Sequence, residues 1–379
     1  MLLSLAGRQI VVDILKPLYA PFTLKSLKLK NRFAMSPMTR YFAPDGLPTA
    51  DMEAYYRRRA EGDVGLIISE GLGIDRVSSR AVNFVPNFYG AALEGWAKVL
   101  QGVHAAGSAM APQFWHVGGQ PDYNFPDAEH APLESPSGLI GPNVAGGRVM
   151  SEEDIADNIA SFARATLAAK VMGFDAVEVH AAHGYLVDQF FWSATNCRGD
   201  GYCGEEISAR SRFGAEIIRA MRRAVGEDFV LSIRVSQWKT GYYDTKLAKT
   251  PAELESWLGP LADAGVDLFD CSQRRFWEPE FDGSDLNFAG WVKKVIGKPT
   301  ITVGSVGLDR DLFADFASGE SKPNLDSLEE LTRRFDRGDF DIVAIGRALL
   351  GDPWWLQKIR DGRFSELQPY SVKAMQTHF

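Results

Sequence analysis

The chain has 379 residues, 45% of them hydrophobic, so it can bury a large core. A net charge of -8 and the lack of a long Lys/Arg run argue against a nucleic-acid partner, and no stretch approaches the roughly 20 apolar residues that span a membrane. Three irregularly spaced cysteines form no disulfide framework, which is typical of a reducing compartment. We therefore expect a cytoplasmic protein, either a monomer or a homo-oligomer.

The N-terminal segment MLLSLAGRQIVVDILK is mildly apolar, but Arg8 and Asp13 interrupt it. It also lacks the basic start and the cleavage site of a signal peptide. We predict an N-terminal extension over residues 1–16. No linker or low-complexity tract divides the rest of the chain, which predicts a single domain over residues 17–379.

Short apolar runs bounded by Gly, Pro or Asp alternate with helical patterns along this domain. The runs predict strands over residues 33–38, 64–70, 109–115, 174–180, 229–235, 266–271, 299–304 and 340–346. Helices are expected from Ser151 to Gly173 and over residues 205–225, 251–264 and 309–317. The pattern predicts an α/β fold, a (β/α)8 TIM barrel. An open doubly wound sheet is the alternative, but no G-x-G-x-x-G follows the first strand.

The Gly- and Pro-rich stretch over residues 117–150 is longer than an ordinary loop. It follows the third predicted strand, and we expect it to form an inserted lid. In a barrel the chemistry lies at the carboxyl ends of the strands and in the loops after them. The residues at those ends therefore decide what the chain can do.

Polar side chains leave the fourth and fifth strands on one face. Alternation puts Val177 and Val179 toward the helices, and Glu178 and His180 into the barrel mouth. The same alternation aims Arg234 inward, where a buried arginine needs an anion or an acceptor-rich ligand. Arg234 pairing with Glu178 is the simpler alternative. The H-x-x-H spacing also permits a metal, with His116, Glu178 or Asp270 as further ligands, but the helical H-E-x-x-H pattern is absent.

Glycines end the seventh and eighth strands, at Gly304 and Gly346, and Arg347 follows directly. Loops at these two positions of a barrel often bind a phosphate, because glycine lets backbone N–H groups approach it. Turn geometry and a surface cation are the alternative explanations.

These segments resemble the Old Yellow Enzyme family. The resemblance is carried by HAAHGYLVDQF (residues 180–190), NCRGDGYCG (196–204) and RSRF (210–213), and by shorter matches from residue 18 to residue 353. It implies a noncovalent FMN, NADPH or NADH as the reductant, no metal, and reduction of the C=C bond of α,β-unsaturated carbonyl or nitro compounds. Alternatives within flavin chemistry are nitrate-ester or nitroarene reduction and oxidative demethylation.

The resemblance also implies the residue roles. Thr39 would bond near O4 and N5 of the flavin, Gln113 its pyrimidine part, and Arg234 the N1–O2 edge, where the reduced ring carries negative charge. The full expected set of cofactor-binding residues is Pro37, Thr39, Gly71, Gln113, His180, Arg234, Gly304, Ser305, Gly346 and Arg347.

For the substrate, the resemblance implies that His180 and His183 donate hydrogen bonds to its oxygen and that Tyr185 is the proton donor. The aromatic residues Trp238, Phe276 and Trp277 follow strands five and six and are expected to shape the pocket. Two departures from the family pattern, Gly119 and Cys203, lie in loops and put the shape of the lid in doubt.

Overall fold

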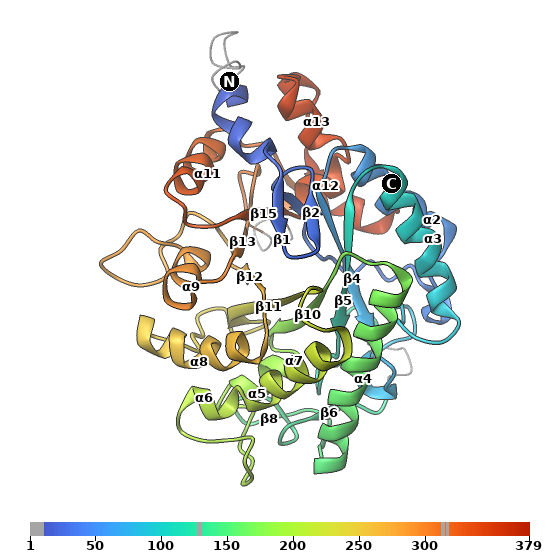
Figure 1. Ribbon diagram of the computed structural model, residues 1–379, viewed down its shortest axis with the longest axis vertical. Coiled ribbons are helices and arrows are strands. Elements are labelled where there is room, and N and C mark those ends of the chain that lie inside the picture. The colour runs from blue at the N-terminus through green and yellow to red at the C-terminus, as the bar shows by residue number, and fades with distance from the viewer. Residues whose placement is uncertain (1–10, 127–130, 312–314, 316–317) are drawn as a thin grey trace.

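A closed barrel of eight parallel strands forms the centre of the molecule (Figure 1). The computed structural model describes residues 11–126, 131–311, 315 and 318–379. The prediction of a (β/α)8 barrel is confirmed, in place of an open sheet. Around the barrel the strands are β3 (Phe33–Met35), β4 (Leu66–Gly73), β5 (Ala109–Trp115), β10 (Ala176–His183), β11 (Val230–Lys239), β12 (Leu268–Ser272), β13 (Thr300–Val303) and β15 (Ile342–Ile345).

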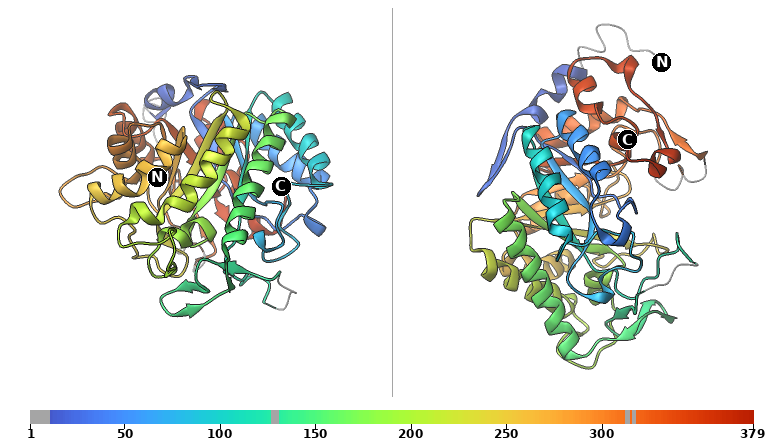
Figure 2. Two further views of the ribbon diagram at one scale, coloured as in Figure 1. Left: turned by 60° about the horizontal axis from the view of Figure 1, so that its bottom comes forward. Right: turned by 90° about the vertical axis from the view of Figure 1, so that its right-hand side faces the viewer.

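Helices surround the barrel (Figure 2). They include α2 (Ala50–Glu61), α3 (Ala92–Ala105), α4 (Glu152–Met172), α5 (Leu186–Phe191), α6 (Ile207–Arg210), α7 (Arg212–Val225), α8 (Pro251–Ala264), α9 (Phe288–Ile296), α11 (Asp326–Asp336), α12 (Arg347–Gly351) and α13 (Trp355–Arg360). Ser151 and Asp154 form a capping box at the start of α4, and Gly173 ends it at φ 93°, as predicted. The helix predicted over residues 205–225 begins at Ile207 and breaks at Ser211. Much of the segment 309–317, also predicted to be helical, lies outside the described residues.

Alternation along the strands separates two apolar cores. Val177 and Val179 pack outward against the helices, whereas Ala176 and Val230 pack inside the barrel. The interior core also contains Leu27 and Leu29 of a hairpin, β1 (Phe22–Leu24) and β2 (Leu27–Leu29), which the sequence analysis did not predict. Since the interior side chains near the amino ends are apolar, the polar ones on the same face gather at the carboxyl ends.

The segment after β5 forms two small sheets, β6 (Glu134–Ser135) with β9 (Arg148–Val149) and β7 (Leu139–Gly141) with β8 (Val144–Ala145). Figure 2 shows it beside the first turns of α4. A further pair, β14 (Glu320–Ser321) and β16 (Tyr370–Ser371), joins the C-terminal part to the segment after β13. The role of residues 117–150, the segment after β5, as a lid stays a prediction.

Residues 11–15 are helical, and Val11 and Leu15 are buried in the outer core. The boundary at residue 16 between an extension and the barrel domain stays a prediction. Among the described residues, no helix combines the length and the apolar character needed to cross a lipid bilayer.

Candidate functional site

A cavity of about 330 Å³ lies at the carboxyl ends of the strands. Its wall includes Pro37, Arg234, Gly304, Ser305, Gly346 and Arg347 from the predicted cofactor set, together with His183 and Trp238. These residues come from segments that are far apart in the sequence. The barrel therefore brings together the two glycine-bearing strand ends and the arginine of the fifth strand.

Arg234 lies on β11, which runs between β10 and β12. Its partners in register on those two strands are His180 and Asp270. Its Nη1 donates to Ser36 Oγ at 3.1 Å and lies 3.5 Å from Asp270 Oδ2. Glu178 is held instead by Gln113 and Ser232, at 2.9 and 3.0 Å, so the alternative pairing of Arg234 with Glu178 is not observed. Arg234 Nε is buried and has no hydrogen-bond partner among the described residues. Arg234 as a whole lines the cavity, and an incompletely paired buried guanidinium there suits an acceptor-rich ligand.

Four predicted cofactor residues, His180 among them, do not line the cavity. Gly71 and Gln113 pair in register on β4 and β5, and Thr39 is partly exposed in the segment after β3. A Cβ atom on Gly71 would lie only 2.7 Å from the indole of Trp115. Glycine at this position therefore allows Trp115 to pack against the strand.

His180, His183 and Tyr185 converge at one strand end. The ring centroid of His180 lies 5.2 Å from that of His183 and 5.0 Å from that of Tyr185. Trp115 completes the cluster, edge-on to Tyr185 at 4.9 Å. The sequence analysis missed Trp115, although the signal was present: it follows Gln113 by two residues and so leaves the strand on the same face.

All three polar rings are hydrogen-bond donors at neutral pH. Burial, with Arg234 nearby, lowers the pKa of His180 to about 3, and burial beside His180 and Arg234 holds the pKa of His183 well below its usual value. Burial, helped by Asp122, raises the pKa of Tyr185 to about 12. The Ala182 N–H lies 3.4 Å from His180 Nδ1, which places the proton of the neutral ring on Nε2.

His183 is held on several sides. Its ring stacks on Trp238, with centroids 4.3 Å apart and planes 24° apart. Its Nε2 lies 2.8 Å from Ser272 Oγ, on the cavity wall. Its backbone has a φ of 65°, which is unusual for a residue other than glycine.

The other end of the cavity carries two arginines, Arg274 and Arg347, which pair with Asp311 and Asp315 respectively. Arg347 Nη2 donates to Ser305 Oγ at 3.0 Å, and Arg347 also pairs with Asp315. Arg274 reaches the same end, where the Arg274 carbonyl accepts a bond from Ser305 Oγ at 3.0 Å. Two guanidinium groups and a hydroxyl suit a phosphate group.

Phe276 and Trp277 do not line the cavity. The Phe276 N–H donates to Gly304 O at 3.1 Å, and its ring is fully buried in the outer core. Trp277 lines a separate surface hollow with Asn324, Ser327 and Glu330. Of the three aromatic residues expected to shape the pocket, Trp238 alone lies on its wall.

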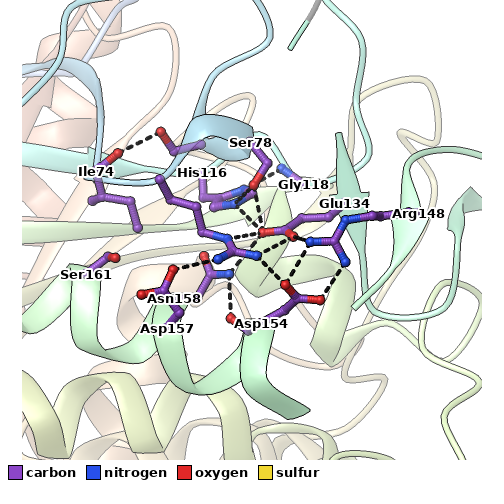
Figure 3. A network of polar contacts seen from close by, with 12 residues as sticks. Ile74, Ser78, His116, Gly118, Glu134, Arg148, Asp154, Asp157, Asn158 and Ser161 are labelled. Carbon is purple, nitrogen blue, oxygen red and sulfur yellow. Dashed lines mark hydrogen bonds and ion pairs between the residues drawn. The ribbon is translucent and has the colours of Figure 1, made fainter. Parts of the chain in front are cut away.

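The insertion is tied to the barrel through a buried carboxylate, Glu134 (Figure 3). It accepts hydrogen bonds from Ser78 (2.7 Å), His116 (3.2 Å) and Asn158 (3.0 Å), and it forms ion pairs with Arg76 and Arg148. The Gly118 N–H donates to His116 Nδ1, so His116 Nε2 carries a proton and is the donor to Glu134. We call this group the Glu134 cluster. Leu133, beside Glu134, packs in one apolar group with Trp115 and Tyr185, so the cluster fixes a wall next to the site.

The two departures from the family pattern have local structural roles. A Cβ atom on Gly119 would lie 2.3 Å from Gly146 O in the insertion, so a larger residue would push the insertion outward. Cys203 Sγ lies 3.2 Å from Asn196 O, within its own loop.

Within the described part of the chain, no group of three or more His, Cys, Asp or Glu side chains is arranged to hold a metal ion. The site combines a cavity with two arginines at one end, a further buried arginine with a donor unpaired in that part of the chain, and neutral proton donors beside it. On a (β/α)8 barrel, this combination is compatible with the flavin-dependent oxidoreductase that the family resemblance implies.

Comparison with known proteins supports this class. A profile of the NADH:flavin oxidoreductase / NADH oxidase family matches residues 17–322, and the chain belongs to that family. The chain is 31% identical to NADPH dehydrogenase from Bacillus subtilis, over 90% of this chain and 93% of that protein. Morphinone reductase, solved in complex with tetrahydroNAD, superposes with a TM-score of 0.76 at 26% identity, covering 94% of this chain and 93% of that one.

The chain spans about half the length of two other curated relatives. It covers 52% of NADH oxidase from Thermoanaerobacter brockii, at 31% identity over 93% of this chain. It covers 50% of metal reductase from Desulforamulus reducens, at 29% identity over 93% of this chain.

Proposed function

We propose that the chain is an FMN-dependent NAD(P)H oxidoreductase that reduces the C=C bond of α,β-unsaturated carbonyl or nitro compounds. One observation carries the proposal: two neutral imidazoles and a protonated phenol converge at the same strand ends as a buried arginine with a spare donor. The nicotinamide analogue bound to morphinone reductase and the name NADPH dehydrogenase support NAD(P)H as the reductant.

The residues present fit FMN. Arg234 would face the pyrimidine edge of the ring and balance its negative charge, and Gly304, Ser305, Gly346 and Arg347 would hold the phosphate. Pro37, Thr39, Gly71 and Gln113 are proposed to lie against the ring, as the family resemblance implies. When bound, FMN would supply the hydride chemistry that connects NAD(P)H to the β-carbon of the substrate.

The chain supplies hydrogen bonds and a proton. His180 and His183 would donate to the carbonyl or nitro oxygen of the substrate, which makes the β-carbon electrophilic. Because neither imidazole titrates near neutral pH, both would remain donors without carrying a charge. Tyr185 would deliver the proton to the α-carbon, and its raised pKa keeps the phenol protonated until then.

The test combines flavin content with turnover. The purified protein should bind FMN and should consume NADPH or NADH when 2-cyclohexenone is added without oxygen, giving cyclohexanone. Tyr185→Phe should keep its flavin and lose about 10² to 10⁴-fold in turnover, which is the usual contribution of a positioned acid. A protein that takes up no FMN would refute the cofactor assignment, and an unchanged rate in Tyr185→Phe would remove the phenol from the mechanism.

The same donors would bind the oxygen atoms of a nitrate ester or a nitroarene. Parallel product analysis on 2-cyclohexenone, 1-nitrocyclohexene and a nitrate ester separates these reactions.

A further inference from the structure

A fully buried ion pair lies directly beneath the segment that carries His183 and Tyr185. Lys239 Nζ and Asp188 Oδ1 are 2.8 Å apart, and neither side chain is exposed to solvent. Lys239 is the last residue of β11, and Asp188 lies in the first turn of α5. Taking both charges out of water is costly. An apolar pair of similar volume often stabilises a fold at least as much as a buried ion pair does. Stability alone is therefore a weak reason for this pair.

Each partner binds the backbone at the rim of the cavity. Asp188 Oδ2 accepts the N–H of Gly184 at 2.6 Å, and Lys239 Nζ donates to the carbonyls of Ser236 and Gln237 at 3.2 and 3.1 Å. The pair thus connects the loop after β10 to the end of β11. Gly184 stands between His183 and Tyr185 in the chain, so its position helps to set theirs.

The backbone held in this way has an unusual conformation. His183 and Gly184 have φ values of 65° and 87°, and the regular pairing of β10 with β11 shifts between Ala181 and His183. A histidine in the left-handed region persists only where its surroundings impose that conformation. The His183 N–H donates to Ser236 Oγ at 3.0 Å and its carbonyl accepts from Thr240 at 3.2 Å, so β11 supplies partners for His183 as the ion pair does for Gly184.

We infer that Asp188 and Lys239 are positioning residues: they hold Gly184, and through it the His183 ring and the Tyr185 phenol, at the distance from the cavity that the reaction needs. The inference rests on the proposed function. Neither residue lines the cavity, so neither is expected to touch the substrate or the flavin. Misplacement of reacting groups by about 1 Å costs roughly 10²-fold in rate.

The first readout is structural and needs no turnover. In Lys239→Met, the buried Asp188 carboxyl loses the charge that keeps it ionised, and the neutral acid is a weaker acceptor for the Gly184 N–H. Hydrogen exchange of the peptide that spans residues 183–190, measured on the purified flavin-loaded protein, should become at least 10-fold faster. Asp267→Asn is the matched control, because it breaks the buried Arg222–Asp267 pair at the opposite end of the barrel. It should leave exchange at residues 183–190 unchanged.

The second readout separates positioning from general stability. After anaerobic reduction, reoxidation by 2-cyclohexenone should slow about 10- to 100-fold in Lys239→Met, whereas reoxidation by oxygen, which needs no hydrogen bond to a carbonyl, should stay within about 2-fold of wild type. The neutral double variant Asp188→Asn/Lys239→Gln keeps donors and acceptors at both positions. It should recover most of the enone rate, and it serves as the test if Lys239→Met does not fold.

Unchanged exchange and an unchanged enone rate in a folded Lys239→Met protein would overturn the inference. So would an enone rate in the double variant as slow as that of an Asp188→Leu/Lys239→Met variant, which keeps none of the hydrogen bonds. If the wild-type protein does not reduce enones at all, the proposed function fails, and the exchange experiment still tests the hold on Gly184.

Discussion

The Glu134 cluster offers a direct test of how the insertion is held. Glu134→Gln keeps the size of the side chain and removes its charge. Glu134 is fully buried, whereas Arg148 is about half exposed. Arg76 and Arg148 both keep Asp154 as a partner, at 2.7 Å each, so neither arginine is left without a counter-charge. The change therefore weakens the attachment of the insertion without leaving a buried cation unpaired.

The size of the effect follows from these contacts. Breaking a buried ion pair costs about 3–5 kcal/mol, and the remaining Asp154 contacts favour the lower end, about 3 kcal/mol. At about 2.1 cal/mol/K per residue, the unfolding entropy of 379 residues is about 0.8 kcal/mol/K, so the midpoint of unfolding should fall by about 4 °C. Because Leu133 packs with Trp115 and Tyr185, KM for a bulky enone should rise while the flavin content stays the same.

The assays are thermal unfolding, limited proteolysis within residues 117–150, and steady-state kinetics. Asp157→Asn is the control: its ion pair with Arg76 lies at the exposed edge of the same cluster and should contribute at most about 1 kcal/mol. If Glu134→Gln matched Asp157→Asn in all three assays, the cluster would not be what fixes the insertion.

Two further predictions concern charge. Arg234→Met should weaken FMN binding at least 10-fold in an equilibrium titration of the apoprotein, because it removes the guanidinium group from the cavity wall; equal affinity would contradict the assignment. Hydrogen bonds from Arg148 hold the pKa of Asp154 below its usual value, and those from Arg76 and His116 do so for Glu134 against the effect of burial. The unfolded chain then binds more protons in acid, so this stabilisation is present above about pH 4 and is lost below it. Urea unfolding between pH 7 and pH 3 should show a smaller loss in Glu134→Gln than in wild type.

The fold could be predicted because a parallel barrel leaves a strong pattern in the sequence. Strands buried on both faces are continuous apolar runs, and all eight were found. The hairpin of β1 and β2 was missed because its strands have three residues each, and FTL and LKL carry little periodic signal. The break at Ser211 was also missed, since even in the structure the backbone angles of Ser211 stay in the helical region, at φ -75° and ψ -10°.

The site was predictable where it depends on strand alternation. His180 and Arg234 face inward because their apolar neighbours face outward, and this follows from the residue pattern alone. Phe276 was placed near the pocket by its closeness to β12 in the sequence. The loop turns it into the outer core, because its N–H binds Gly304 and its carbonyl accepts from Asn287 at 2.8 Å. Such loop hydrogen bonds depend on tertiary contacts and leave no periodic signal.

The candidate site therefore has two kinds of parts. Gln113, His180 and Arg234 stand on strands whose register fixes them, and they belong to the half of the site that would bind the flavin. His183 and Tyr185 stand in a loop that is held by side chains, through the Asp188–Lys239 pair, and the wall beside Tyr185 is held by the Glu134 cluster. The residues on the strands do not depend on the Asp188–Lys239 pair or on the Glu134 cluster. Changes at Asp188, Lys239 or Glu134 should therefore alter which acceptors are reduced, and how fast, more than they alter the binding of the cofactor.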